Sequence, residues 1–146
     1  MKISIPKNAP QSTDVIGDIL KNYKTIAVVG LSSNPARPSY GVTQYMQSSG
    51  YRIIPVNPNE TEVLGEKCYP RLEDIPNPQQ VEIVDIFRRS ANIPPVVDSA
   101  IKIGAKVVWM QQGIANQAAA EKARDAGLLV IEDACILIEH RLRLRS

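Results

Sequence analysis

The stretch VVGLSSNPARPSYGV, residues 28–42, decides the fold because it joins a buried strand to a helix through a single glycine. The run TIAVVGL around its start is apolar and rich in β-branched residues, which is typical of a parallel strand covered on both faces. Gly30 lets the chain turn tightly where that strand ends. The second and third glycines of a G-x-G-x-x-G dinucleotide loop are missing, and serines, an asparagine, two prolines and Arg37 stand in their place. The stretch therefore predicts a phosphate loop of a different kind.

Short apolar strands alternate with amphipathic helices along the rest of the chain. Strands are expected at 25–31, 51–58, 81–87, 106–111 and 128–132. Helices are expected at about 12–23, with Ser12 as N-cap, after the first strand up to Gly50, from Pro94 onward, at about 116–126 and at about 134–143. The stretch 57–78 is expected to be a long loop with one helical turn near 71–75. This order predicts an α/β fold: a Rossmann-like, doubly wound, parallel five-stranded sheet with helices on both faces and strand order 3-2-1-4-5. No repeat or linker interrupts it, so residues 1–146 are predicted to form a single domain.

Composition narrows the classes of partner. The chain has 17 basic and 15 acidic residues and a net charge of +2, which is too balanced for a protein that coats nucleic acid. Cys68 and Cys135 lie far apart in the sequence, so neither a zinc site nor a disulfide framework is expected. No apolar stretch is as long as a membrane span and the first residues lack a signal core, so we expect a cytoplasmic protein without a membrane partner.

Ligands of such sheets bind at the carboxyl ends of the strands, where the strand order reverses. In the first loop, short polar side chains, the N–H groups at the start of the next helix near Ser39 and the guanidinium of Arg37 predict an anion site. Phe87, the only phenylalanine, is placed to stack on or cover a flat base, and one of the two following arginines is expected to face the site. The candidates at the five strand ends are Gly30, Leu31, Ser32, Ser33, Asn34, Arg37 and Ser39; Asn57 and Pro58; Phe87, Arg88 and Arg89; Gln111, Gln112 and Gly113; and Asp133.

The end of the second strand argues against an ordinary dehydrogenase. An NAD site usually places Asp or Glu about 20 residues after the first glycine, to hold the ribose hydroxyls. Here that position reads IPVNP, and the first acid is Glu60. Together with the missing glycines, this makes NAD a weaker ligand hypothesis.

Five segments, VVGLSSNPARPSYGV, GYRIIPVNP, GEKCYPRLEDIP, VEIVDIF and GAKVVWMQQGIANQAAAEKARDAGLLVIEDAC, together resemble the small single-domain CoA-binding proteins. These are similar to the N-terminal CoA-binding domain of the succinyl-CoA synthetase α subunit and of ADP-forming acyl-CoA synthetases. The resemblance covers about residues 23–139. It implies coenzyme A as the cofactor, with its diphosphate at Gly30, Ser32, Asn34 and Arg37. It also implies that Val56, Asn57 and Pro58, and Ile86, Phe87 and Arg88, border the nucleotide.

The expected cofactor-binding set is therefore Gly30, Leu31, Ser32, Ser33, Asn34, Arg37, Ser39, Val56, Asn57, Pro58, Ile86, Phe87, Arg88, Gln111 and Gly113. The ligand is expected to be CoA or an acyl-CoA. Two alternatives stay open: an enzyme or sensor that uses NAD(P) or another adenine nucleotide in the same cleft, and a non-catalytic subunit of an acyl-CoA ligase. The sequence does not indicate an oligomeric state.

No catalytic or metal-ligating set is expected. The only histidine, His140, is read as a helix-face residue near the carboxyl terminus, and no Ser-His-Asp, paired-carboxylate or metal-ligand pattern is visible. Both cysteines are expected to be small buried side chains. A further hypothesis is that one of them forms a mixed disulfide with CoA, with Cys68 preferred because its loop is long.

Overall fold

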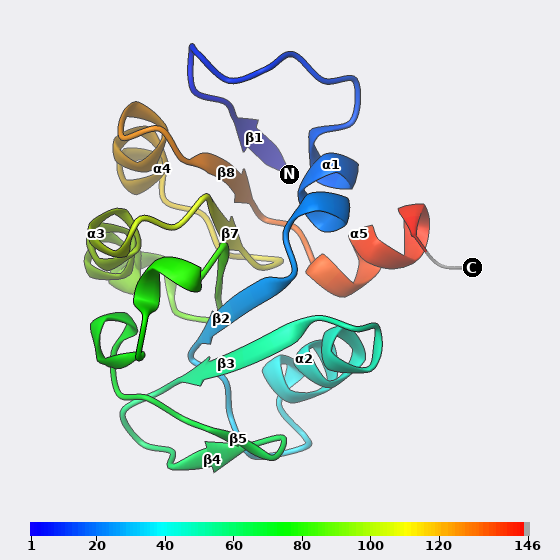
Figure 1. Cartoon of the computed structure of the whole chain (residues 1–146), viewed down its shortest axis with the longest axis vertical. Helices are drawn as coiled ribbons and strands as arrows, with labels where there is room; N and C mark the ends of the chain where they lie inside the picture. Colours follow the sequence, from blue (N-terminus) through cyan, green and yellow to red (C-terminus); the bar gives the residue numbers. More distant parts are fainter. Residues whose placement is uncertain (145–146) are drawn as a thin grey trace.

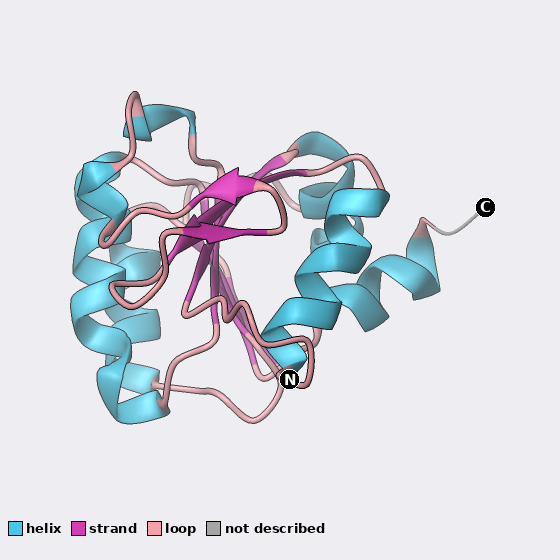
Figure 2. Ribbon diagram, turned by 90° about the horizontal axis from the view of Figure 1, so that it is seen from below, coloured by secondary structure: helices cyan, strands magenta, loops and turns pink. Residues whose placement is uncertain are grey.

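The computed structural model describes residues 1–144 and places a six-stranded sheet between two layers of helices (Figure 1, Figure 2). The strands of this sheet are β1 (Lys2–Ser4), β2 (Thr25–Val29), β3 (Arg52–Val56), β6 (Ile83–Ile86), β7 (Val107–Met110) and β8 (Leu129–Glu132). A separate hairpin is made of β4 (Glu62–Val63) and β5 (Glu66–Lys67). The helices are α1 (Val15–Asn22), α2 (Pro38–Ser48), α3 (Ile93–Ile103), α4 (Gln117–Asp125) and α5 (Ile136–Arg143). Short 3₁₀ turns span Leu72–Asp74, Pro78–Gln80 and Ser90–Asn92.

The predicted α/β class and mostly parallel sheet are confirmed, but the strand order and count are different. The order is β1-β8-β7-β6-β2-β3. Numbered as the five expected strands this reads 2-1-3-4-5, because β6 pairs with β2, with Ile83 opposite Ile26. The sixth strand, β1, was not predicted and pairs antiparallel with β8. The predicted order 3-2-1-4-5 was therefore wrong for strand 81–87.

The side of the sheet on which each connection lies explains this order. Helix α2 packs on one face between β2 and β3, whereas Leu72 and Ile75 of the connection from β3 to β6 are buried in the core of the opposite face. Crossovers between parallel strands are right-handed. A connection on the opposite face must therefore lead back past β2, which places β6 beside it. The strand order reverses between β2 and β6, so the first loop remains at the reversal point.

Alternate residues of each strand supply two separate cores, as expected of a strand buried on both faces. Ile26 and Val28 of β2 face the core shared with α1, α2 and α5, whereas Ala27 and Val29 face the core shared with α3 and α4. Trp109 of β7 is fully buried. Figure 2 shows the two helical layers on opposite sides of the strands.

Several predicted helix ends need correction at the level of a few residues. The first helix begins at Val15, and its N-cap is Asp14, whose side chain accepts a hydrogen bond from the Gly17 N–H. Ser12, the predicted cap, instead donates its hydroxyl to Asp18. The last helix begins at Ile136 and ends at Arg143. The predicted proline in the first turn of α3 is confirmed, and α4 ends at Asp125, shortly before Gly127, whose φ is +96°.

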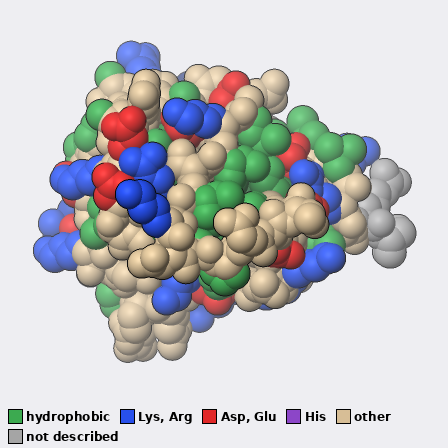
Figure 3. Space-filling model, turned by 90° about the horizontal axis from the view of Figure 1, so that it is seen from above, with side chains coloured by type: hydrophobic (Ala, Val, Ile, Leu, Met, Phe, Trp, Pro, Cys, Tyr) green, Lys and Arg blue, Asp and Glu red, His purple; other side chains and the backbone are tan. Residues whose placement is uncertain are grey.

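The connection 57–78 holds the predicted helical turn, at Leu72–Asp74, and also the β4–β5 hairpin, which was not predicted. Within residues 1–144, no helix is both long and apolar enough to cross a membrane. The face in Figure 3 carries basic and acidic side chains interspersed around a group of hydrophobic ones, so neither sign of charge dominates it.

Candidate functional site

The exits of β2, β3 and β6 are joined at Gly30. Its N–H donates to the Val56 carbonyl at 2.8 Å, and the Phe87 N–H donates to the Val29 carbonyl at 2.8 Å. Gly30 has φ +88°, and a Cβ atom there would lie 2.6 Å from the Phe87 carbonyl oxygen. Only glycine allows both this conformation and this approach. The expected turn after the first strand is therefore also the point where two neighbouring strand ends come closest.

The short polar side chains of the first loop mostly satisfy the loop's own backbone. Ser39 Oγ accepts from the Ser32 N–H at 3.1 Å, and Ser32 Oγ accepts from the Asn34 N–H at 3.0 Å. Asn34 Oδ1 accepts from the Ala36 N–H at 3.0 Å. These bonds hold the loop open without further glycines. They also mean that Ser32 and Ser39 act as loop supports as well as candidate ligand contacts.

Ser33 is engaged by an acid from the neighbouring connection. The Ser33 N–H donates to Glu60 Oε2 at 2.6 Å, and the Ser33 hydroxyl donates to Glu60 Oε1 at 3.0 Å. The backbone bond first, and the hydroxyl bond second, hold the pKa of Glu60 below its usual value, so the carboxylate is charged at neutral pH. Neither residue lines the cleft described next.

A cleft of about 660 Å³ opens at the carboxyl ends of β2, β6 and β7. Three arginines, Arg37, Arg88 and Arg89, line it together with Phe87, and its lining contains no acidic residue. None of the three arginines forms an ion pair with any residue of the described chain. The complete lining is Gly30, Ser32, Arg37, Pro38, Ser39, Val42, Phe87, Arg88, Arg89, Gln111, Gln112, Ile114 and Cys135. Such a lining suits a polyanion with an apolar or aromatic part.

A second cavity of about 270 Å³ adjoins the cleft at Arg88. Apolar side chains such as Val56, Leu72 and Val96 form much of its lining, and its second arginine, Arg71, is paired with Asp74 at 3.1 Å, so it is more apolar than the cleft. Arg88 therefore stands between a cationic space and an apolar one. A ligand with a phosphate and a flat or extended apolar group matches this pair of spaces.

The structure brings seven of the fifteen predicted site residues into the cleft lining and Val56, with Arg88 again, into the adjoining cavity. The cleft set is Gly30, Ser32, Arg37, Ser39, Phe87, Arg88 and Gln111. Leu31 and Ile86 are buried in the core, and Asn57 supports the loop by donating to the Leu31 carbonyl at 3.0 Å. Ser33, Asn34, Pro58 and Gly113 lie outside both linings.

Residues that sequence reasoning left out of the final set lie in the lining. Both Arg88 and Arg89 line the cleft, because the chain turns into a 3₁₀ segment at Ser90. Gln112 lines it whereas Gly113 turns away to donate its N–H to Asp133 Oδ1 at 2.6 Å. The alternation of side chains along a strand does not predict which of these residues face the cleft, because Arg88 and Arg89 lie beyond the end of β6, and Gln112 and Gly113 lie beyond the end of β7.

A fully buried acid lies beneath Gln111. Asp85 Oδ1 accepts from Gln111 Nε2 at 2.5 Å, and Gln111 Oε1 accepts from the Ile136 N–H at 3.4 Å. Burial is the main cause that raises the pKa of Asp85, to about 7. Asp85 therefore fixes the amide of Gln111 and links the cleft floor to the start of α5. The sequence suggested no role for it.

The two cysteines differ in place. Cys135 is half-buried and lines the cleft immediately before α5. Cys68 is 5% exposed, its sulfur faces the Asn57 carbonyl at 3.5 Å, and burial first raises the pKa of its thiol. Only Cys135 therefore lies beside the cleft, whereas the sequence hypothesis of a mixed disulfide preferred Cys68. Among residues 1–144, no group of three or more His, Cys, Asp or Glu side chains is arranged to hold a metal ion.

Comparison with known families shows to which family the chain belongs. The profile described as "CoA binding domain" matches residues 24–141. The chain belongs to the CoA-binding domain family. This CoA-binding domain protein is 44% identical over 125 residues to the uncharacterized protein YneT of Bacillus subtilis, covering 86% of this chain and 91% of YneT.

Two further relatives connect the family to larger proteins and to solved structures. An ADP-forming acetate–CoA ligase II of Archaeoglobus fulgidus is 29% identical over 124 residues, which are 83% of this chain and 17% of that ligase. A hypothetical protein from Pyrococcus horikoshii OT3 superposes with a TM-score of 0.87 at 41% identity, over 99% of this chain and all of that one (100%). The same fold thus occurs as a small protein and as a part of ligases.

Proposed function

We propose that this CoA-binding domain protein binds coenzyme A or an acyl-CoA in the cleft at the ends of β2 and β6. The observation that carries the proposal is the lining: three arginines without an ionic partner in the described chain, and no acid. CoA carries a diphosphate and a 3′-phosphate, so its charge matches three guanidinium groups. Membership of the CoA-binding domain family and similarity to an acetate–CoA ligase support the same ligand.

The expected pose follows from the two cavities. The phosphates lie among Arg37, Arg88 and Arg89, near the start of α2, where the helix dipole favours an anion. Phe87, half-buried at the strand end, covers the adenine. The thiol arm is expected near Cys135 and Gln111, at the opposite side of the lining. These residues bind and orient the ligand.

NAD and other adenine nucleotides are the second candidate, and Glu60 is the observation in their favour. Its carboxylate reaches the first loop, although sequence reasoning treated this region as free of acid. It holds Ser33 and stays outside the cleft lining, so it is not placed among the arginines. The absence of an acid from the lining favours a ligand with more phosphate charge than NAD.

Calorimetric titration with CoA, 3′-dephospho-CoA and NAD tests the proposal. CoA is expected to bind most tightly, and 3′-dephospho-CoA about 10- to 150-fold more weakly through loss of one charge-assisted contact. At 100 times its dissociation constant CoA adds about 2.7 kcal/mol to the free energy of unfolding. The variant Arg52→Ala, an exposed arginine at the amino end of β3, is the matched control and should leave these affinities unchanged. Binding of NAD as tight as that of CoA would overturn the proposal.

A further inference from the structure

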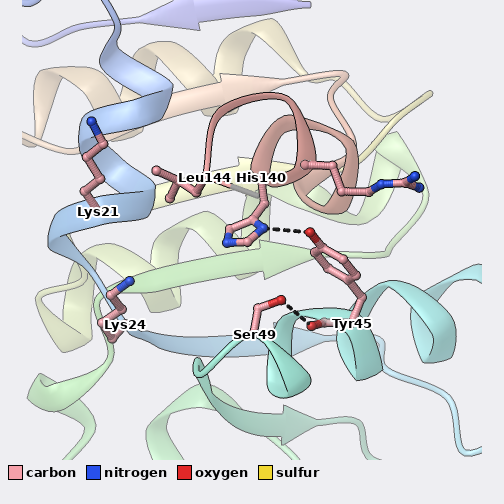
Figure 4. A pocket seen from close by; sticks show the side chains of 7 residues that line it. Lys21, Lys24, Tyr45, Ser49, His140 and Leu144 are labelled. Carbon is pink, nitrogen blue, oxygen red and sulfur yellow. Dashed lines mark hydrogen bonds between the residues drawn. The ribbon is translucent and has the colours of Figure 1, made fainter. Parts of the chain in front are cut away.

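A second cationic pocket lies at the opposite edge of the sheet from the cleft. Lys24 directly precedes β2 and lines the pocket, whereas Gly30 follows β2 and lines the cleft. Six residues of extended chain separate the two sites by about 20 Å. The pocket has a volume of about 800 Å³ and is lined by Lys21, Lys24, Tyr45, Ser49, His140, Arg141 and Leu144 (Figure 4). These residues come from α1, its connection to β2, α2 and α5, so the pocket is formed only in the folded chain.

The lining has three permanent positive charges and no acid. Lys21, Lys24 and Arg141 are exposed, and within residues 1–144 none of them forms an ion pair. Two of the acids on or beside α5 and α1, Glu139 and Asp14, are bound to Arg143 at 2.9 and 3.0 Å. Asp18 on α1 accepts the Ser12 hydroxyl, and Glu82 accepts from the backbone N–H groups of Lys24 and Thr25 at 2.9 and 3.1 Å. None of these four acids lines the pocket or forms an ion pair with its three cations within residues 1–144, so the cations are available to a bound anion.

His140 presents an imidazole to the pocket that neighbouring rings hold in place. It is 8% exposed and lies edge-to-face against both Tyr45 and Tyr51. Its Nδ1 is 2.8 Å from the Tyr45 hydroxyl, and the tautomer of the ring decides which of the two donates. When Tyr45 donates, the neutral ring carries its proton on Nε2, which has no hydrogen-bond partner in the described chain. Figure 4 shows the ring between Tyr45 and Lys24.

Lys24 is also held in place. Its Nζ donates to the Leu20 carbonyl at 3.3 Å and lies 4.6 Å from the centroid of the Tyr51 ring. Burial first, and then the charge of Lys24, keep the pKa of His140 below its usual value. The imidazole thus already experiences the positive field of the pocket. An anion bound beside Lys24 and Nε2 would reverse that effect.

We propose that this pocket binds a phosphate monoester, with Lys21, Lys24 and Arg141 around the phosphate and His140 Nε2 donating to one of its oxygens. A doubly charged group suits three cations better than a carboxylate does. Leu144 and the ring of Tyr45 offer an apolar surface to the organic part of the ester. The site is separate from the cleft proposed for CoA and does not depend on it.

The single histidine makes the test direct, because every imidazole signal in proton–carbon NMR spectra comes from His140. Glycerol 3-phosphate and inorganic phosphate are titrated separately in chloride buffer at constant ionic strength, without CoA. Glycerol 3-phosphate is expected to shift the His140 signals saturably and to raise the pKa of His140. The double variant Lys21→Met/Lys24→Met should weaken binding at least about 10-fold. Circular dichroism checks its fold, and the single variant Arg141→Met gives an independent reading of the same site.

The matched control is Lys7→Met/Lys102→Met, which removes two exposed lysines that form no ion pair in residues 1–144. It should bind as the unmodified protein does, and so should Arg88→Ala, whose substitution lies in the CoA cleft. Equal weakening by the lysine control would show non-specific charge attraction and overturn the proposal. Absence of a saturable His140 shift would also overturn it. Binding of inorganic phosphate without binding of glycerol 3-phosphate would refute the assignment to an ester.

Discussion

Replacing Gly30 with alanine tests whether the closeness of the β2 and β6 exits organises the cleft. The substitution adds one methyl group at φ +88°, where the left-handed backbone costs alanine about 1–2 kcal/mol. The new Cβ would lie 2.6 Å from the Phe87 carbonyl oxygen, which belongs to the backbone and cannot rotate away. The strand ends must therefore separate.

This separation acts on two hydrogen bonds, Gly30 N–H to Val56 and Phe87 N–H to Val29, both at 2.8 Å. Weakening them costs about 0.5–1.5 kcal/mol each. The free energy of unfolding of Gly30→Ala is thus expected to fall by about 2–5 kcal/mol. CoA affinity should also fall in the fraction that remains folded, because Phe87 and Arg88 move with the β6 exit.

Gly113→Ala is the matched control. Gly113 has φ +82°, and an added Cβ would meet no atom within 4 Å, so this variant carries the backbone cost without the contact. Urea unfolding of both variants, followed by calorimetry with CoA, measures the difference. If the two variants lose equal stability and Gly30→Ala keeps its CoA affinity, then the contact between the strand ends does not shape the site.

Three other experiments test the remaining parts of the site. Arg88→Ala should weaken CoA binding about 10- to 150-fold in calorimetry, and more than Arg37→Ala does, because Arg88 is half-buried between the two cavities whereas Arg37 is exposed. A CoA affinity of Arg88→Ala equal to that of the original protein would place Arg88 outside the site. The pKa of Asp85 is about 7 in the fold against an ordinary 3.8, so the folded protein holds a proton that the unfolded chain releases, and stability is lost as the pH rises from about 4 through 7. Asp85→Asn keeps an acceptor for Gln111. Its free energy of unfolding in urea should equal that of the original protein at pH 4 and exceed it at pH 8, by at most about 4 kcal/mol. The same pH dependence of this free energy in both proteins would contradict the prediction. With CoA disulfide, the Cys135 thiolate is expected to attack the S–S bond, form a mixed disulfide and release CoA thiol. Intact-mass measurement should detect this adduct in Cys68→Ser but not in Cys135→Ser. An adduct in Cys135→Ser that is absent in Cys68→Ser would refute the assignment.

The sequence predicted the elements better than their arrangement. Apolar runs and glycine or proline stops located the five parallel strands and the helices within a few residues, because these signals are local. The position of strand 81–87 depends on which face the connection 57–80 covers, and that is decided by the burial of Leu72 and Ile75 against α3 and β6. The antiparallel strand β1 has three residues and two exposed side chains, so it carries no recognisable pattern.

The predicted site residues share a similar limit. The rule that ligands bind at strand ends depends only on element order, and the structure shows Gly30, Arg37 and Phe87 in the lining of one cleft. Which of two consecutive residues faces the cleft depends on turn geometry, as for Arg88 and Arg89. Whether a loop side chain is free to bind a ligand depends on partners that are distant in the sequence. Ser33 was predicted as a ligand contact, and the sequence does not reveal its bond to Glu60, because the two residues lie 27 positions apart.

Glu60 also changes the reason for preferring CoA over NAD. The sequence indicated that the end of the second strand has no acid before Glu60, and the chain turns back there, where Asn57 Oδ1 accepts from the Asn59 N–H at 2.9 Å. The turn brings the Glu60 carboxylate to Ser33, where its lowered pKa keeps it charged. A phosphate on the Ser33 N–H would have to displace that carboxylate and meet its charge. Phosphates are therefore favoured on the other side of the loop, where Arg37, Arg88 and Arg89 provide positive charge and no acid lines the cleft. The preference for a ligand with three phosphates thus follows from the position of Glu60, which Ser33 holds outside the cleft lining.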